Sequence, residues 1–125
     1  MHTAAAALLV GAGGFAGAVA RWALGASVQA KSLHPHFPVH TFVVNLLGCL
    51  AIGVAYGLWE KHETFRLLVI VGFLGGFTTF STFGWETLSL LRDGRVALAA
   101  GYVALSATLG VVLVWLGLKL AGSLS

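Results

Sequence analysis

Residues 72–86 read Gly-Phe-Leu-Gly-Gly-Phe-Thr-Thr-Phe-Ser-Thr-Phe-Gly-Trp-Glu. They lie inside an apolar segment, residues 67–91, whose only charged residue is Glu86. A segment of about 20 apolar residues is long enough to cross a bilayer as a helix. The pair Gly75-Gly76 is costly within a helix, and the hydroxyls of Thr78 and Thr79 can bond to nearby backbone. We therefore predict a membrane-spanning helix that breaks near Gly75–Thr79.

A break at membrane depth has consequences for function. Non-helical backbone is tolerated there only where it is buried in protein or lines a cavity. In transporters, unwound carbonyls and the ends of half-helices hold small cations. We therefore expect functional residues in the third span.

Three further segments have the length and composition of membrane-spanning helices. Residues 4–26 carry one charge, Arg21, and residues 39–59 and 96–118 carry no Asp, Glu, Lys or Arg. We predict an all-α integral membrane protein with four transmembrane helices, in which residues 1–125 form a single domain. The first span should be retained, because its apolar stretch exceeds the roughly 7–15 residues of a signal peptide.

The composition excludes several classes of protein. Hydrophobic residues make up 58% of the 125-residue chain and charged residues 9%, whereas soluble domains carry about 25% charged residues. A soluble fold of this length could not bury so much apolar surface. The net charge of +3 comes from scattered Lys and Arg residues without a basic run, so nothing indicates nucleic-acid binding. A soluble enzyme, a disordered chain and a nucleic-acid-binding protein are excluded.

Small residues recur along the predicted helices. Three pairs of glycines are four residues apart, at positions 13 and 17, 53 and 57, and 72 and 76. This spacing lets helix backbones approach closely in lipid, within one chain or between chains. The lone Cys49 forms no disulfide within the chain, and we interpret it as another small packing residue.

Positive charges are nearly balanced between the two ends of the spans. One end has Lys61, Arg66 and Lys119, and the other has Lys31, Arg92 and Arg95, with Arg21 close to it. Orientation follows an imbalance of such charges, so either the chain inserts both ways up or another feature decides. The near tie favours dual topology, and with it an antiparallel homodimer whose axis lies in the plane of the lipid bilayer.

Aromatic and hydroxyl side chains follow the predicted break. Phe80 and Phe83 share a helical face, with Ser81 and Thr82 between them. Composition alone favours a role for these rings as apolar side chains in the core or facing lipid. An aromatic ring, however, has a positive edge that can face an anion. Ring edges and hydroxyl hydrogens could replace water around an anion without adding formal charge. Glu86 follows Thr82 by four residues and should accept its hydroxyl hydrogen.

The neighbouring spans add polar groups. Asn45 lies one turn after Thr41, and a carboxamide in lipid finds a partner, so a helix-to-helix hydrogen bond and an anion site are both open. Tyr102 and Ser106 are four residues apart and share one face of the last span.

Three stretches together resemble the Fluc (CrcB-type) fluoride channels: residues 72–83, residues 41–48 around Asn45, and residues 17–22 around Arg21. The resemblance covers all four spans in order, and the string Thr-Thr-Phe-Ser-Thr-Phe is its most specific part. It implies a dual-topology homodimer with two antiparallel fluoride pores and a central, structural sodium ion.

The resemblance also assigns roles to single residues. It places seven of them along the fluoride pore: Asn45, Phe80, Ser81, Thr82, Phe83, Tyr102 and Ser106. We assign Thr41, one turn before Asn45, to the same path. Arg21 would lie in a vestibule, and the backbone carbonyls of Gly75 and Thr78 from both subunits would bind the sodium ion. Gly110 stands where some relatives carry a hydroxyl, which leaves the far end of the polar track without a side-chain donor.

The implied function is passive export of fluoride that lowers its cytoplasmic concentration. Burying a small, strongly hydrated anion without donors is costly, and conduction needs binding weak enough for the ion to leave. Neutral donors meet both needs. The membrane potential, about 2.3 kcal/mol per charge per 100 mV, drives an anion out of a cell with a negative interior. The family implies a bacterial inner membrane.

Other functions compete with this interpretation. A small dual-topology, proton-coupled multidrug exporter also has four spans, but it needs a carboxylate deep in the membrane, and Glu86 lies toward the end of the third span. An assembly subunit would explain the glycines but not the polar groups at mid-depth. No acid–base pair or activated nucleophile indicates an enzyme. His34, His36 and His40 lie near two prolines and indicate a turn rather than a metal site.

Overall fold

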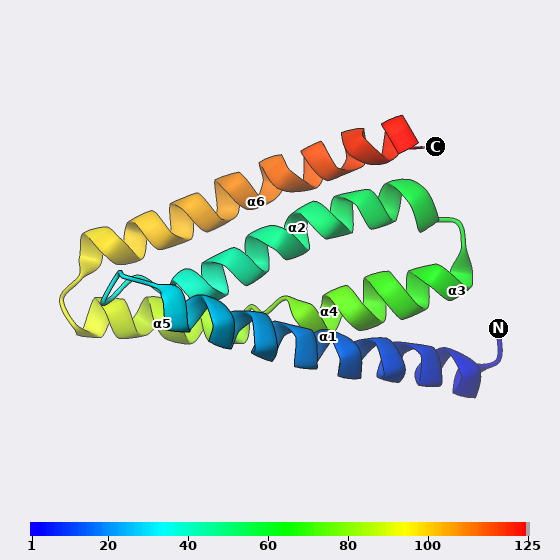
Figure 1. The fold of residues 1–125 in the computed structure, drawn as a ribbon, viewed down its shortest axis with the longest axis horizontal. Coiled ribbons are helices and arrows are strands. Elements are labelled where there is room, and N and C mark those ends of the chain that lie inside the picture. The colour runs from blue at the N-terminus through cyan, green and yellow to red at the C-terminus, as the bar shows by residue number, and fades with distance from the viewer. Residues whose placement is uncertain (125) are drawn as a thin grey trace.

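Four long helical segments make up the computed structural model, which describes residues 1–124 (Figure 1). They are α1 (Thr3–Lys31), α2 (Val39–Trp59), a composite third segment (Glu63–Arg92) and α6 (Val96–Leu124). Each is long and apolar enough to cross a membrane, and residues 1–124 contain no strand. The prediction of an all-α protein with four membrane-spanning helices is confirmed, although α1 and α6 extend beyond the predicted 4–26 and 96–118. Ser125, the last residue of the predicted domain, lies outside the described residues.

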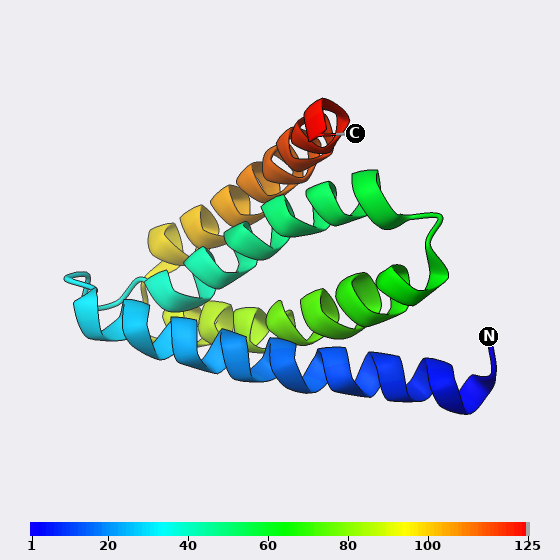
Figure 2. The ribbon, with the colours of Figure 1, turned by 45° about the vertical axis from the view of Figure 1, so that its right-hand side comes forward.

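The helices are arranged so that both termini lie at the same end of the bundle. The turn between α2 and the third segment lies at that end too, and the other two connections lie at the opposite end (Figures 1 and 2). Helix α6 packs along α2, while α1 packs against both α2 and the first half of the third segment. Four successive membrane crossings place the connections alternately at the two ends of the bundle, as seen here.

Glycines allow the closest of these contacts. A methyl group added at Gly13 would overlap the carbonyl oxygen of Leu68, and one at Gly17 would overlap that of Phe73. Between α2 and α6, Gly53 and Gly117 meet the partner helix's backbone in the same way. The predicted close approach of helices at small residues is confirmed, and these contacts lie within one chain.

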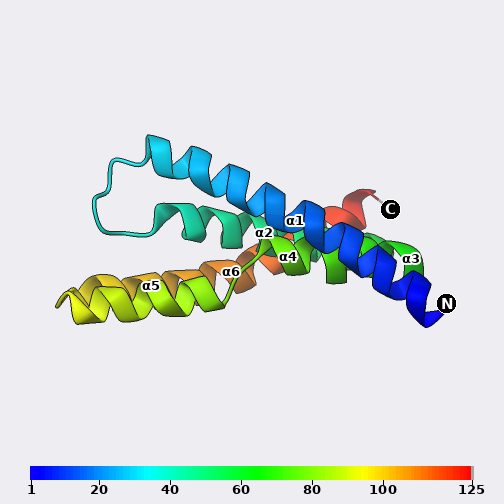
Figure 3. The same ribbon diagram turned by 90° about the horizontal axis from the view of Figure 1, so that it is seen from below.

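The third segment is not one uniform helix. It begins as α3 (Glu63–Phe65), continues as a π-helix η1 (Arg66–Leu74) and a short α4 (Gly75–Phe77), and resumes after an interruption as α5 (Ser81–Arg92). At the interruption Thr78 is extended, with φ −85° and ψ 158°. Figure 3 shows α5 running away from α1 beyond this point, alongside α6.

The break lies at residues 78–80, so the prediction of Gly75–Thr79 is right for the threonines and wrong for the glycine pair. Gly75 and Gly76 remain helical. A methyl group at Gly76 would come within 2.6 Å of the carbonyl oxygen of Gly14 on α1. Gly76 therefore serves close packing against α1, and the helix ends only where Thr78 becomes extended. The π-helix before the break was not predicted, because hydrophobic periodicity does not distinguish it from an α-helix.

An aromatic cluster around Tyr102 lies between α5 and α6. This residue is fully buried, and its ring centroid lies 4.9 Å from that of Phe83 and 5.3 Å from that of Phe37. Leu90 and Ala99 join the same cluster from α5 and α6. The cluster fixes the position of α5 after the break and thereby the position of the polar residues that α5 carries.

Candidate functional site

Two hydrogen bonds hold the non-helical segment to α2. The Asn45 side-chain nitrogen donates to the Thr79 carbonyl oxygen at 3.1 Å, and the Thr79 backbone N–H donates to the Asn45 side-chain oxygen at 3.0 Å. One amide side chain thus satisfies both backbone groups of a residue outside any helix. Of the two uses left open for Asn45, a bond across helices is present, and its partner is backbone rather than a side chain. A carboxamide has two N–H hydrogens, so one remains for a second acceptor.

The break also changes the partners of the carbonyl groups before it. In a continuous helix the N–H groups of Thr79 and Thr82 would donate to the carbonyls of Gly75 and Thr78. Here the Thr79 N–H bonds to Asn45 at 3.0 Å, and the Thr82 N–H bonds to the Thr79 hydroxyl at 3.3 Å. The carbonyls of Gly75 and Thr78 are therefore released from these helical bonds. Oxygens of this kind suit a small, hard cation.

Arg21, which is predicted to lie in a vestibule, binds backbone next to the break. Its Nε donates to the Gly76 carbonyl oxygen at 3.1 Å, across 55 residues of sequence. The guanidinium thus satisfies another carbonyl next to the break. Arg21 also lines a cavity between α1 and α2.

An open groove of about 610 Å³ lies on one side of the break. We call it the amide groove; the polar and aromatic residues that line it are Asn45, Thr78, Thr79, Phe80, Phe83 and Ser106. The Phe80 side chain is 83% exposed, and its ring stacks on that of Phe83 with centroids 5.9 Å apart. Among residues 1–124, no Asp, Glu, Lys, Arg or His lines this groove. It offers a carboxamide, hydroxyls and ring edges without a formal charge.

A second cavity of about 420 Å³ lies on the other side, between α1 and α2. We call it the arginine pocket; its polar lining comes from Arg21, Gln29, His40, Thr41, Thr79 and Thr82. Thr79 lines both this pocket and the amide groove. The non-helical segment is therefore the wall that the two cavities share.

Glu86 binds residues from two other helices. Its Oε2 accepts from the Thr41 hydroxyl at 2.9 Å, and its Oε1 accepts from the Tyr102 hydroxyl at 3.0 Å. The expected bond from Thr82 is wrong, because the carboxylate turns away from its own helix toward these two donors. Each hydroxyl has one hydrogen. While both are committed to Glu86, neither Thr41 nor Tyr102 can donate to an anion.

The residues predicted for the pore do not all line the same cavity. Asn45, Phe80, Phe83 and Ser106 meet in the amide groove, whereas Thr41 and Thr82 line the arginine pocket. Tyr102 is buried between α2, α5 and α6, and Ser81 is exposed at the start of α5 and lines neither cavity. Thr79 and His40 were not predicted as site residues. The position of Thr79 inside the expected break was a usable signal, but nothing in the sequence places His40 against Glu86.

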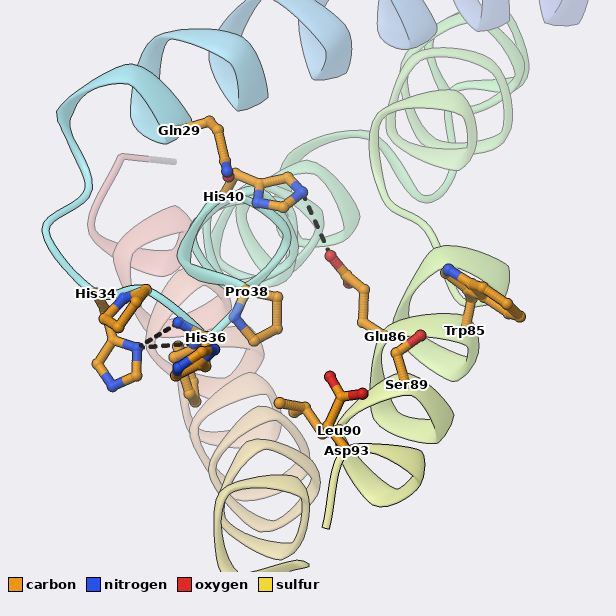
Figure 4. A pocket seen from close by; sticks show the side chains of 12 residues that line it. Gln29, His34, His36, Pro38, His40, Trp85, Glu86, Ser89, Leu90 and Asp93 are labelled. Carbon is orange, nitrogen blue, oxygen red and sulfur yellow. Dashed lines mark hydrogen bonds and ion pairs between the residues drawn. The ribbon is translucent and has the colours of Figure 1, made fainter. Parts of the chain in front are cut away.

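The histidine-rich loop is a backbone turn. His34 Nδ1 accepts from the backbone N–H groups of His36 at 3.1 Å and Phe37 at 2.7 Å (Figure 4). Within residues 1–124 no three His, Cys, Asp or Glu side chains come together in a way that could hold a metal ion. The loop's hydrogen bonds thus fit the predicted turn.

Comparison with known proteins gives consistent matches over nearly the whole chain. The family described as "CrcB-like protein, Camphor Resistance (CrcB)" matches residues 8–118. A protein of Methylobacillus flagellatus named "fluoride-specific ion channel FluC" is 48% identical over 117 residues, which cover 90% of this chain and 91% of that protein. Proteins with the same name from Pseudomonas fluorescens and Solibacter usitatus are 49% and 43% identical, and cover 90% and 91% of the chain and 94% and 96% of their own lengths.

Asn45 should be required for stability because it satisfies both backbone groups of Thr79. Asn45→Ala leaves these groups without their partner, and we expect the free energy of unfolding in mixed micelles to fall by about 2 kcal/mol. Thr108→Ala is the matched control, since the Thr108 hydroxyl bonds only to its own helix at Ala104 and is exposed. It should stay within about 0.5 kcal/mol of the wild type. Equal stability of the two variants would contradict the role given to Asn45.

Proposed function

The chain belongs to the CrcB-like protein family, and on that premise we propose that it is a fluoride-selective channel whose conduction path runs along the broken third span. It is a multi-pass integral membrane protein, and its family is one of ion channels rather than enzymes. The observation that carries the proposal is the amide groove, where neutral donors and two phenylalanine rings meet without a charged side chain.

Fluoride makes specific demands on such a path. The ion is small and strongly hydrated, so each water molecule it loses must be replaced by a donor. A lysine or arginine in the groove would supply donors but would also hold the ion, whereas conduction requires that it leave again. The amide hydrogen of Asn45, the hydroxyl of Ser106 and the positive edges of Phe80 and Phe83 would supply contacts of moderate strength.

We place two such paths in an antiparallel homodimer. The amide groove is open on one side in a single chain, and Phe80 is 83% exposed there. A second chain that covered Phe80 would close the open side of the groove and shield the fluoride path from lipid. The near balance of positive charge at the two ends supports insertion in both orientations. Each chain would then contribute one groove to the assembly.

The same dimer would hold a structural sodium ion on its axis. Its ligands would be the carbonyl oxygens of Gly75 and Thr78 from both chains, which the break releases from their helical hydrogen bonds. The cation would compensate carbonyl dipoles at membrane depth and would make the centre of the dimer less unfavourable for an anion. The Thr78 hydroxyl donates to the Leu74 carbonyl oxygen at 3.0 Å, so the Thr78 side chain would play no part in binding sodium.

The channel would export fluoride without an energy source. The relatives above are proteins of bacteria, and we place this chain in a bacterial inner membrane. A potential that is negative inside drives an anion outward with about 2.3 kcal/mol per 100 mV. Passive conduction is then enough to lower the concentration of fluoride in the cytoplasm.

Phe80→Ile tests the role of the ring edges in the proposed path. The substitution keeps an apolar side chain but removes the positive edge, and we expect the fluoride flux from liposomes to drop about tenfold. Phe15→Ile is the matched control, because Phe15 is 76% exposed on α1 and lines neither cavity. Its flux should equal that of the wild type. Unchanged flux in Phe80→Ile would exclude the ring edges from conduction.

Removal of sodium tests the proposed cation site. When sodium is replaced by the bulky cation N-methylglucamine, the melting temperature of the purified dimer should fall by about 5–10 °C, because a ligand that binds only the folded state stabilises it. Potassium at the same ionic strength serves as the control for a size-selective site. The same melting temperature in all three salts would rule out a structural sodium ion.

A further inference from the structure

A further cavity, apart from the amide groove and the arginine pocket, lies at the end of the bundle where α1 joins α2 and α5 joins α6 (Figures 1 and 2). It holds about 480 Å³, and we call it the turn pocket. His34 and His36 line it from the first connection, and Arg95 lines it from the second, next to residues 96–98 of α6. The pocket thus joins basic side chains from two connections that are far apart in the sequence.

The Arg95 side chain is exposed and has no partner of its own. Its backbone is held in place, because the Arg95 N–H donates to the Leu90 carbonyl oxygen at 2.9 Å and Gly94 before it has a φ of 75°. Within residues 1–124 no carboxylate lies at ion-pair distance from the guanidinium, and no hydrogen bond engages it. A guanidinium presents five N–H donors in a planar fork that matches a phosphate group. All of these donors are available at Arg95.

His34 adds a second donor to the pocket. Its Nδ1 accepts from the backbone N–H groups of His36 and Phe37. A ring nitrogen that accepts a hydrogen bond carries the lone pair, so the hydrogen of the neutral ring is on Nε2. Within residues 1–124 no acceptor takes this hydrogen, and the side chain is exposed. His34 therefore offers an N–H group even without a positive charge.

The charges around the turn pocket favour an anion. Among residues 1–124, no Asp or Glu lines it, and its charged side chain is that of Arg95. Asp93 and Glu86 line a neighbouring cavity, which shares His34 and His36 with the turn pocket. The carboxylates therefore lie beyond the histidines, and the turn pocket itself presents donors to a ligand.

Apolar side chains surround the same donors. Residues 96–98 line the pocket, and Val96 is 60% exposed. Leu33, the residue before His34, is 98% exposed. From the pocket, α6 continues as a membrane-spanning helix with exposed apolar side chains such as Val103. Donors at the end of such a helix fit a lipid headgroup whose acyl chains follow this apolar surface, whereas an inorganic phosphate would gain nothing from it.

We propose that the turn pocket binds the phosphate group of an anionic phospholipid, with Arg95 and His34 as its donors and the apolar start of α6 against the acyl chains. A charged donor suits this task, because a bound lipid need not be released quickly, whereas a conducted anion must leave again. No residue of the turn pocket lines the amide groove or the arginine pocket. The site is therefore separate from the proposed fluoride path and does not depend on it.

The test measures lipid binding to the purified protein in micelles of a neutral detergent, by native mass spectrometry. The probes are phosphatidylglycerol, which has a net negative charge, and phosphatidylcholine with the same acyl chains, which has none. We expect phosphatidylglycerol to bind about tenfold more tightly. Inorganic phosphate should displace it no better than chloride at the same ionic strength, because the acyl chains contribute to binding.

Two substitutions in the pocket should remove this preference. Arg95→Gln should lower the affinity for phosphatidylglycerol about five- to tenfold, and the backbone bond of Arg95 survives the change. Ala97→Glu places a carboxylate in the pocket and should also abolish the preference. A negative charge in the first turn of α6, which has no acidic residue, is favourable for the helix. This variant should therefore fold at least as well as the wild type, as a thermal melt would show.

Arg92→Gln is the matched control, because it removes the same charge from the last turn of α5, where the exposed side chain does not line the turn pocket. It should keep the wild-type preference. An equal loss in Arg92→Gln and Arg95→Gln would mean attraction by the whole surface and would overturn the inference. Equal binding of the two lipids by the wild type, or displacement by inorganic phosphate, would overturn it too. None of these results bears on the fluoride channel, which flux measurements test separately.

Discussion

A backbone polar group at membrane depth must find a partner inside the protein, and the exchange of two hydrogen bonds between Asn45 and Thr79 meets this requirement where the third span is not helical. The other features of the site depend on it. Because Thr79 is held by α2, α5 can begin at Ser81 in a new direction and pack against α6. Because the Thr79 N–H is used in this way, the Gly75 carbonyl loses its helical donor. The Arg21 side chain satisfies the next carbonyl, that of Gly76, at 3.1 Å.

Polar residues near the break are of two kinds, those whose hydrogens already bond to an acceptor in the protein and those with a hydrogen still free to donate. The hydroxyls of Thr41 and Tyr102 donate to Glu86, and this carboxylate fixes their orientation rather than leaving them free for an anion. The amide groove keeps donors that are not committed in this way, above all the second amide hydrogen of Asn45. The proposed fluoride path would thus use neutral donors on one side of the broken segment, whereas Arg21 and His40 line the arginine pocket on the other side.

The sequence is a good guide to the helices and a poorer guide to the contacts between them. The length of an apolar segment is a local property, and the span predicted for residues 39–59 coincides with α2. The break at the threonines is expected from local chemistry, whereas the close packing of Gly76 against α1 is a contact between helices that local sequence does not reveal. Partners of Glu86 are separated from it by 45 and 16 residues. No periodicity reports such distances, which is why the expected pairing with Thr82 failed and His40 was not identified.

The most direct test of the central claim is the anion flux through the unmodified protein. Liposomes that contain the purified protein would be loaded with fluoride in one preparation and with chloride in another, and release would be followed with ion-selective electrodes under the same potassium diffusion potential. Our account predicts rapid release of fluoride and no release of chloride above that of protein-free liposomes, because the groove offers closely spaced neutral donors to a small, strongly hydrated anion. Equal release of the two anions, or no release of fluoride from the folded protein, would contradict it.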